Sequence, residues 1–416
     1  MDDLLGLTGL FMVGIITLYV ALRRPSLRLV LLVAFLVRAV AVLFNVYVGS
    51  LPASGADAIT FERRAWEWSQ AGITEIWTTY LQLDSYMISR VLGTLYAFTG
   101  RSLLLAQSVS LGLGLGTVYL VYRVADTLWG ASAAKKAAWV SVFFPTLVLY
   151  SALTLREAYI WFFFLLGLLG VAYWAGGKGK KGAALAVSGF AVATCFHGGM
   201  VIALFAFLTL AGVLSVKKLV ARLGAGFLRP AAALVVILSM IAVGSYAMGA
   251  FSVPKIGTID QLTDTERLLS RFERSSRDTA SYPAWLVPDS FPEMIMLAPA
   301  RTIYFLYSPF PWDVSAARHL IGLADALLYM VLTFFLWRNR KAIWRDRRSR
   351  AVFLVVLPVL FVFAIAIGNF GTGLRHRAKF AAALIALAAP RLPRVVAGLK
   401  PGTTLRPSAV CESVRR

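Results

Sequence analysis

The sequence predicts an all-α fold, namely a polytopic transmembrane helix bundle with interfacial helices in two long extracytoplasmic loops. Of the 416 residues, 59% are hydrophobic and only 15% are charged, and the mean hydropathy is +0.74. Because soluble domains are about one-quarter charged, this composition excludes an ordinary soluble enzyme and a disordered chain. Several apolar runs also approach the roughly 20 residues with which a helix crosses a bilayer core.

Apolar segments of near-spanning length predict about 11 spans. We therefore expect a single transmembrane domain over residues 1–390, followed by a basic cytoplasmic tail over residues 391–416. The apolar segments are residues 5–22, 29–48, 102–122, 134–153, 157–175, 183–196, 199–216, 230–250, 319–337, 351–368 and 378–390.

The distribution of charge predicts how these spans are oriented. Arg23, Arg24 and Arg28 directly follow the first segment, which places the N-terminus outside and the first turn in the cytoplasm. Counting alternate sides from there puts every basic cluster but one, and the C-terminal tail, on the cytoplasmic side. Most acidic residues fall instead in two outer loops, residues 49–101 and 251–318. Anionic membrane lipids rather than nucleic acid then explain the net charge of +22, and we expect a multi-pass protein of the plasma (inner) membrane.

Both outer loops are expected to contain structured segments. Residues 58–76 carry an apolar stripe at helical spacing, which predicts an amphipathic helix in the membrane interface. Residues 86–99 are too short to span and predict a second interfacial or re-entrant helix. In the second loop, the aromatic, proline-containing stretch of residues 304–312 predicts a re-entrant segment packed against protein. The stripe of the first helix consists of Phe61, Ala65, Trp68 and Gly72.

The one basic cluster on the outer side is Arg375-His376-Arg377 with Lys379, between the last two apolar segments. Positive charge on the translocated side opposes the usual topology bias, so a negative partner must compensate for it. Two guanidinium groups can each donate paired hydrogen bonds to a phosphate or pyrophosphate. Pairing with loop acids or with lipid phosphates is an equally weighted explanation.

Asp57 stands just before the predicted interfacial helix of the first outer loop. A helix N-cap is the simpler explanation, because Asp side chains there accept hydrogen bonds from backbone N–H groups. A carboxylate held at the membrane face could instead take a proton from an acceptor hydroxyl. The sequence leaves both roles open.

Arg156 and Glu157 lie together at the outer end of a span. They could form a snorkelling ion pair that anchors the helix end, or they could line a cavity that contacts a lipid-linked substrate; we favour the cavity. His197 lies near the outer face, where a hydrogen-bonded structural role is more common than a ligand role. With three histidines and no paired spacing, a histidine-based metal site is not supported.

The order of these features resembles the GT-C superfamily of integral membrane glycosyltransferases. An Asp in the first outer loop is followed by an amphipathic helix, by RSLLLAQSVSLGLGLGTVYLVYRVADTLWG from Arg101, and then by AAWVSVFFPTLVLYSALTLREAYIWFFF. The likeness covers residues 50–175 best and continues in the closing GTGLRHRAKFAAALIALAA.

The resemblance implies transfer of a sugar from a polyprenyl-phosphate-linked donor to a glycan or lipid acceptor on the extracytoplasmic side. The first-loop acid of the family, a base or a metal contact, corresponds to Asp57. The basic residues that hold the carrier phosphate correspond to Arg375 and Arg377, with Arg156 as a further candidate and His376 and His197 beside them.

One departure from the family pattern concerns the metal. Many members carry a second acid directly beside the first, whereas Ala58 follows Asp57 here and Glu62 is the nearest alternative. The resemblance therefore implies Asp57 and Glu62 as the catalytic carboxylates and puts a divalent metal in doubt. No other cofactor is implied.

Two alternative functions remain open. A lipid-linked oligosaccharide polymerase or ligase for a cell-surface polysaccharide would use a large outer loop with arginines, and a lipid-linked glycan flippase would need ionisable residues near the midplane. The midplane has few such residues, mainly Arg38 and Asp325. The arginines of the second outer loop are Arg267, Arg271, Arg274 and Arg277.

Overall fold

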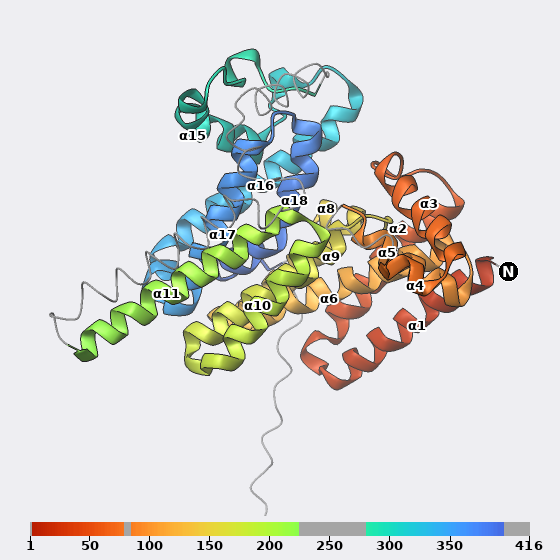
Figure 1. Cartoon of the computed structure of the whole chain (residues 1–416), viewed down its shortest axis with the longest axis horizontal. Helices are drawn as coiled ribbons and strands as arrows, with labels where there is room; N and C mark the ends of the chain where they lie inside the picture. The colour runs from red at the N-terminus through yellow and green to blue at the C-terminus, as the bar shows by residue number, and fades with distance from the viewer. Residues whose placement is uncertain (1, 79–84, 224–279, 395–416) are drawn as a thin grey trace, which may run out of the picture.

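The computed structural model describes residues 2–78, 85–223 and 280–394, and the regular elements of this part of the chain are helices, as predicted (Figure 1). The predicted span over residues 230–250, the arginines at 267–277 and most of the predicted tail lie outside the described residues. The helices are α1 (Asp2–Arg23), α2 (Arg28–Tyr47), α3 (Asp57–Ala71), α4 (Ile73–Thr78), α5 (Met87–Thr99), α6 (Leu103–Trp129), α7 (Ala131–Phe143), α8 (Pro145–Ser151), α9 (Glu157–Tyr173), α10 (Gly179–Phe196), α11 (Val201–Leu223), α15 (Phe291–Tyr307), α16 (Ala317–Arg345), α17 (Arg347–Ala366) and α18 (Phe370–Ala388).

Seven helical stretches within the described residues are long and apolar enough to cross a membrane, which fits a multi-pass membrane protein. The structure does not confirm the predicted number of about 11 spans. The seven stretches are Asp3–Arg23, Pro25–Tyr47, Leu103–Trp129, Glu157–Phe196, Gly198–Val216, His319–Arg345 and Arg347–Ala366.

Two predicted spans, residues 134–153 and 378–390, differ from the observed helices, and the long apolar stretch Glu157–Phe196 is divided into two helices at the place where the sequence predicts two segments. The segment predicted at 134–153 is split into α7 and α8, because Pro145 holds Phe144 in an extended conformation (φ −66°, ψ 115°). The stretch Glu157–Phe196 is two helices, α9 and α10, which pack on each other after a turn in which Gly177 has φ 100°. The last predicted span begins earlier, at Phe370, and includes the basic cluster.

Helix α18 lies at the centre of the bundle and contacts α6, α7, α9, α15, α16 and α17. Every residue from Arg377 to Ala389 is buried. A helix enclosed on all sides shows no amphipathic stripe, so its apolar composition alone did not indicate which face meets which neighbour.

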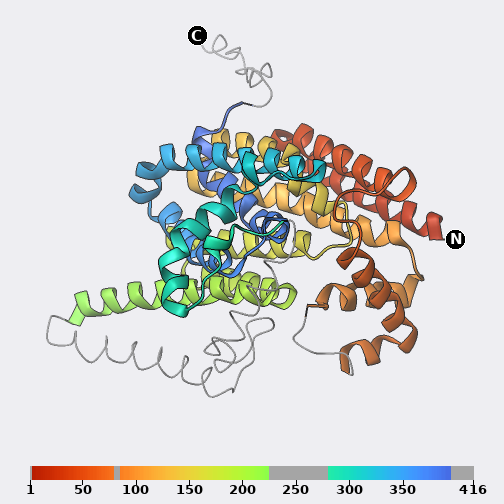
Figure 2. The same ribbon diagram turned by 90° about the horizontal axis from the view of Figure 1, so that it is seen from above.

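Helices α3, α4 and α5 form a group at the edge of the bundle, near the N-terminus of α1 (Figures 1 and 2). They confirm that residues 58–76 and 86–99 are helical, but the single helix predicted over 58–76 is two helices, α3 and α4, because the chain breaks at Gly72 with φ 94°. Phe61 and Ala65 of the predicted stripe are buried, and α3 packs closely on α5, where a Cβ at Gly93 would lie 2.9 Å from the carbonyl oxygen of Ala65.

The aromatic stretch at residues 304–312 is divided between a helix and a turn. Residues 304–307 end α15, and Phe310 packs against Tyr304 with ring centroids 5.1 Å apart. Arg301 of the same helix donates a hydrogen bond of 2.8 Å from Nη2 to the carbonyl oxygen of Ile367, next to the start of α18. This hydrogen bond joins α15 to the segment that precedes α18, although the two residues are 66 positions apart in the sequence.

Candidate functional site

Three charged side chains from different parts of the chain meet at one point. Arg375 of α18 donates bidentate hydrogen bonds to Glu157, from Nε to Oε1 at 2.6 Å and from Nη2 to Oε2 at 3.2 Å. Its Nη1 atom donates to Oδ2 of Asp57. The Glu157 side chain is fully buried, that of Arg375 is 19% exposed, and that of Asp57 is 55% exposed. The cluster therefore runs from the interior to an accessible carboxylate.

Local structure places each of the three residues. Asp57 is the first residue of α3 and Glu157 is the first residue of α9, so both carboxylates lie at positive helix ends. Arg375 follows the start of α18, where the Asn369 side chain caps the helix by accepting a hydrogen bond of 2.7 Å from the Gly371 backbone N–H.

The N-cap role expected for Asp57 is wrong in this structure. The cap position belongs to Ala56, which makes no side-chain hydrogen bond and has φ 36° and ψ −97°. A non-glycine residue in that region is strained, and such strain concentrates at functional sites. Asp57 lies one residue later, with its carboxylate turned to Arg375.

Two further residues of α18 extend the cluster inward. Lys379 lies one helical turn after Arg375 and is buried, with Nζ 3.8 Å from Oε1 of Glu157 and 3.0 Å from Nδ1 of His376. The His376 ring lies edge-on to that of His197, with centroids 5.4 Å apart. The sequence analysis placed Lys379 in the outer basic cluster but gave it no role in the site, although its spacing of four residues from Arg375 places both on one helix face.

Arg156 is the remaining cation of the site and is 4% exposed. Its guanidinium carbon lies 5.7 Å from the centre of the Phe61 ring. Its Nε and Nη1 atoms are buried and have no hydrogen-bond partner among the described residues. Burial lowers the pKa of Arg156 below its ordinary value, whereas the carboxylates of Glu157 and Asp57 act in the opposite direction. A buried guanidinium without acceptors is costly, so this position favours an added anion.

The charges of the site do not cancel. Among the described residues, the cations Arg156, Arg375 and Lys379 face the two carboxylates of Asp57 and Glu157, so these five side chains carry one net positive charge. The cluster can therefore accept one further negative charge.

Arg377 does not belong to this cluster, contrary to the expected phosphate role. It lies on another face of α18, and its donors bind the carboxylate of Asp325 (2.7 Å from Nη2) and three backbone carbonyls. The carbonyls belong to Leu306, Ser308 and Gly322. Because all five guanidinium N–H groups have protein acceptors, none is left for a phosphate.

Glu62, the alternative catalytic carboxylate, is also occupied elsewhere. It is 6% exposed and accepts two hydrogen bonds from Arg101, at 2.9 Å and 2.7 Å, and one from the Tyr96 hydroxyl at 3.2 Å. Burial, with the nearby Glu62 charge, raises the pKa of Tyr96 well above its ordinary value, so this hydroxyl stays a donor. Glu62 therefore fixes α3 to α5 and to the start of α6.

The residues present do not fit a divalent metal. Both carboxylates of the site are bridged by the Arg375 guanidinium, whose charge opposes a second cation between them. Within the described residues, no group of three or more His, Cys, Asp or Glu side chains could hold a metal ion.

Comparisons with known proteins give no relative for this chain. No protein-family model matches it, and neither the curated proteins nor the solved structures contain a significant match.

Proposed function

We propose that the chain is a membrane glycosyltransferase of the GT-C type, which transfers a sugar from a polyprenyl-phosphate carrier to a glycan or lipid acceptor on the extracytoplasmic side. In the reaction, the bond between the anomeric carbon and the phosphate oxygen breaks, and the acceptor hydroxyl forms the new bond at that carbon. The hydroxyl proton passes to Asp57. Polyprenyl phosphate leaves with the electron pair, so negative charge grows on the phosphate, where guanidinium groups stabilise it.

The observation that carries this proposal is the buried Arg156 guanidinium, two of whose nitrogens find no acceptor in the part of the chain that the structure describes. The charges of Asp57, Glu157 and Arg375 act on this guanidinium. A phosphate oxygen would supply the missing acceptor, and Arg375 could donate to a second oxygen. Inside a protein, hydrogen bonds from a charged donor to phosphate are among the strongest available.

The two carboxylates are suited to different roles. Glu157 is fully buried and held by Arg375 and Lys379, so it orients the cations rather than meeting an acceptor. Asp57 is 55% exposed, and only its Oδ2 atom is engaged by Arg375. Its Oδ1 atom can therefore face an acceptor hydroxyl, which is the geometry that a general base requires.

The charge balance supports a monophosphate carrier. A sugar linked to a polyprenyl chain through one phosphate is a diester with one negative charge, and the five described charged side chains of the site together carry one net positive charge. A pyrophosphate-linked donor would bring two negative charges and exceed this balance. The proposal therefore places polyprenyl-monophosphate sugars ahead of pyrophosphate-linked ones.

The alternative functions gain no support from the described residues. The arginines that favoured a polymerase or ligase lie outside them. Of the residues that a flippase would need at the midplane, Arg38 donates to the carbonyl oxygens of Ser141 (3.2 Å) and Val142 (3.3 Å). Asp325 pairs with Arg377. Both side chains thus have protein partners.

The proposal predicts that Arg156→Gln weakens binding of polyprenyl monophosphate about 10- to 100-fold, since a hydrogen bond to a charged group contributes about 1.5–3 kcal/mol. Binding is measured on the purified chain in lipid nanodiscs. The matched control is Arg63→Gln, because Arg63 lies on α3 with 61% of its side chain exposed and pairs with Glu67 one turn away.

Arg63→Gln should bind like the wild type. If Arg156→Gln does not fold, Arg375→Gln tests the second donor in the same assay. If the wild type, the control and the folded variant bind polyprenyl monophosphate with equal affinity, phosphate binding at this site is excluded.

A further inference from the structure

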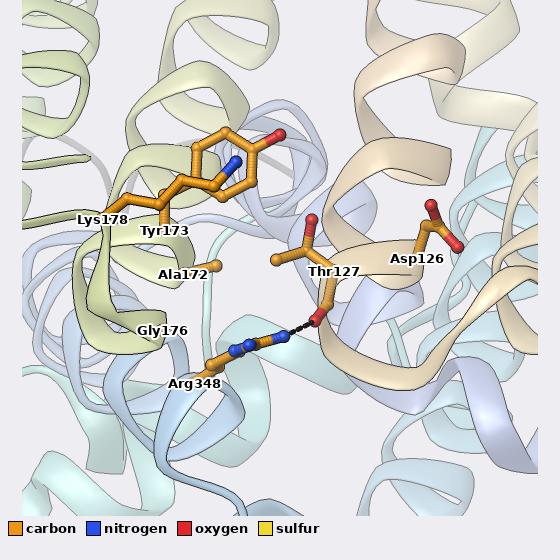
Figure 3. A pocket seen from close by; sticks show the side chains of 7 residues that line it. All are labelled: Asp126, Thr127, Ala172, Tyr173, Gly176, Lys178 and Arg348. Atoms are coloured by element: carbon orange, nitrogen blue, oxygen red, sulfur yellow. Dashed lines mark hydrogen bonds between the residues drawn. The ribbon is translucent and has the colours of Figure 1, made fainter. Parts of the chain in front are cut away.

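A polar cavity lies at the opposite end of α9 from Glu157. It has a volume of about 240 Å³ and is lined by the ends of α6 and α9, by the turn before α10 and by α17 (Figure 3). Glu157 and Tyr173 begin and end α9, so the cavity lies about 24 Å along this helix from the candidate site. The two sites are therefore separate.

Two cations reach this cavity from distant parts of the sequence. Lys178 ends the turn between α9 and α10, with Nζ 3.9 Å from the centre of the Tyr173 ring. Arg348 of α17 donates a hydrogen bond of 3.1 Å from Nη1 to the carbonyl oxygen of Thr127 (Figure 3). Within the described residues neither cation has a carboxylate within 4.0 Å, so both can take an anion.

Neighbouring residues leave room for these cations and fix their position. A Cβ at Gly176 would lie 2.6 Å from Nε of Arg348, so the absence of a side chain at this position lets the guanidinium approach. The Tyr173 hydroxyl accepts a hydrogen bond of 2.6 Å from Arg123, which fixes the ring beneath Lys178.

A second basic cavity lies next to this one. Asp126 lines both cavities, and the neighbouring one, of about 210 Å³, is also lined by Arg24 and Arg123. The walls of the two cavities together contain four cations and one carboxylate. In Figure 3 the Asp126 carboxylate lies on the far side of Thr127 from Lys178 and Arg348, which leaves the space between these cations to another anion.

We propose that Lys178 and Arg348 bind the phosphate of an anionic ligand, supplied by the headgroup of a phospholipid at the cytoplasmic face or by free phosphate. Lysine and arginine side chains at the ends of transmembrane helices attract anionic lipid phosphates in this way. The volume of about 240 Å³ is below the roughly 300–1,000 Å³ of pockets that enclose drug-sized ligands, so it suits a headgroup rather than a nucleotide.

The experiment compares Lys178→Gln/Arg348→Gln with the matched control Lys180→Gln/Lys181→Gln, which removes two exposed cations that do not line the cavity. The full chain in neutral detergent is titrated with phosphatidylglycerol, phosphatidylcholine or inorganic phosphate, and thermal unfolding and lipid retention are measured. Phosphatidylglycerol should stabilise the wild type and the control, and its affinity should fall roughly tenfold or more in the cavity variant. Phosphatidylcholine should stabilise none of them.

The outcomes separate the two sources of phosphate. If the cavity variant loses affinity for phosphatidylglycerol alone, the ligand is a lipid headgroup. If it loses affinity for inorganic phosphate to the same extent, the ligand is free phosphate. Equal responses of the cavity variant and the control to both ligands would overturn the proposal. If the double variant does not fold, Lys178→Gln alone is compared with Lys180→Gln in the same titrations.

Discussion

The central residue of the candidate site is Arg375, which joins a buried carboxylate to an exposed one. Glu157 needs this partner, because a carboxylate in the interior without a cation would be strongly destabilising. Asp57 does not need a cationic partner, because 55% of its side chain is exposed and water solvates its charge. The ion pair between Arg375 and Asp57 is therefore the contact that a substrate phosphate can replace at the lowest cost.

Asp57→Asn is predicted to lower sugar transfer by about 10²- to 10⁴-fold while leaving polyprenyl monophosphate binding near the wild-type level, because the amide cannot accept the acceptor proton. Transfer is measured in membranes that contain the endogenous lipid-linked sugars, as the release of polyprenyl phosphate.

Glu62→Gln is the matched control on the same helix. This change weakens the pairing of Glu62 with Arg101, so it should lower the melting temperature. Transfer per folded molecule should stay near the wild-type level. Unchanged transfer in Asp57→Asn would exclude Asp57 as the base.

At the scale of elements, α9 positions Glu157 through close packing against α10. A Cβ at Gly189 would lie 2.4 Å from the backbone nitrogen of Gly167, and one at Gly170 would lie 2.3 Å from that of Ala186. Because these neighbours are backbone atoms, they cannot rotate away. The two helices can approach this closely only with glycine at these positions.

Gly189→Ala is therefore predicted to destabilise the protein by about 1–3 kcal/mol through overpacking. The control is Gly212→Ala in α11, where the added Cβ meets no described atom within 4 Å. Alanine favours a helix over glycine by up to about 1 kcal/mol, so the control should be neutral or stabilising. Unfolding in detergent measures both, and equal effects would contradict the packing argument.

The sequence predicted several elements well because their signals are local. Apolar length located α1, α2 and α6, and helical spacing located α3. The break before Pro145 was missed, because apolar composition continues across it. The orientation of α18 could not be predicted, because this helix is buried on all sides. Arg375 and Arg377 were therefore predicted to share one role, although Arg375 binds Glu157 and Arg377 binds Asp325.

At the scale of the whole molecule, the site depends on contacts between distant parts of the chain. Asp57 and Arg375 are 318 positions apart, and Glu157 and Arg375 are 218 apart. The charge pattern predicted that these residues share the outer side of the membrane, but nothing local in the sequence specifies their pairing. The unpartnered nitrogens of Arg156 likewise follow from tertiary packing alone.

The most direct test is a cryo-EM map of the full chain in lipid nanodiscs with polyprenyl monophosphate bound. We predict phosphate density at about 3 Å from Nε or Nη1 of Arg156, with Arg375 turned from Asp57 toward a phosphate oxygen. Phosphate density away from α18 and the start of α9, or an Arg156 guanidinium bound to protein carbonyls instead, would contradict the account.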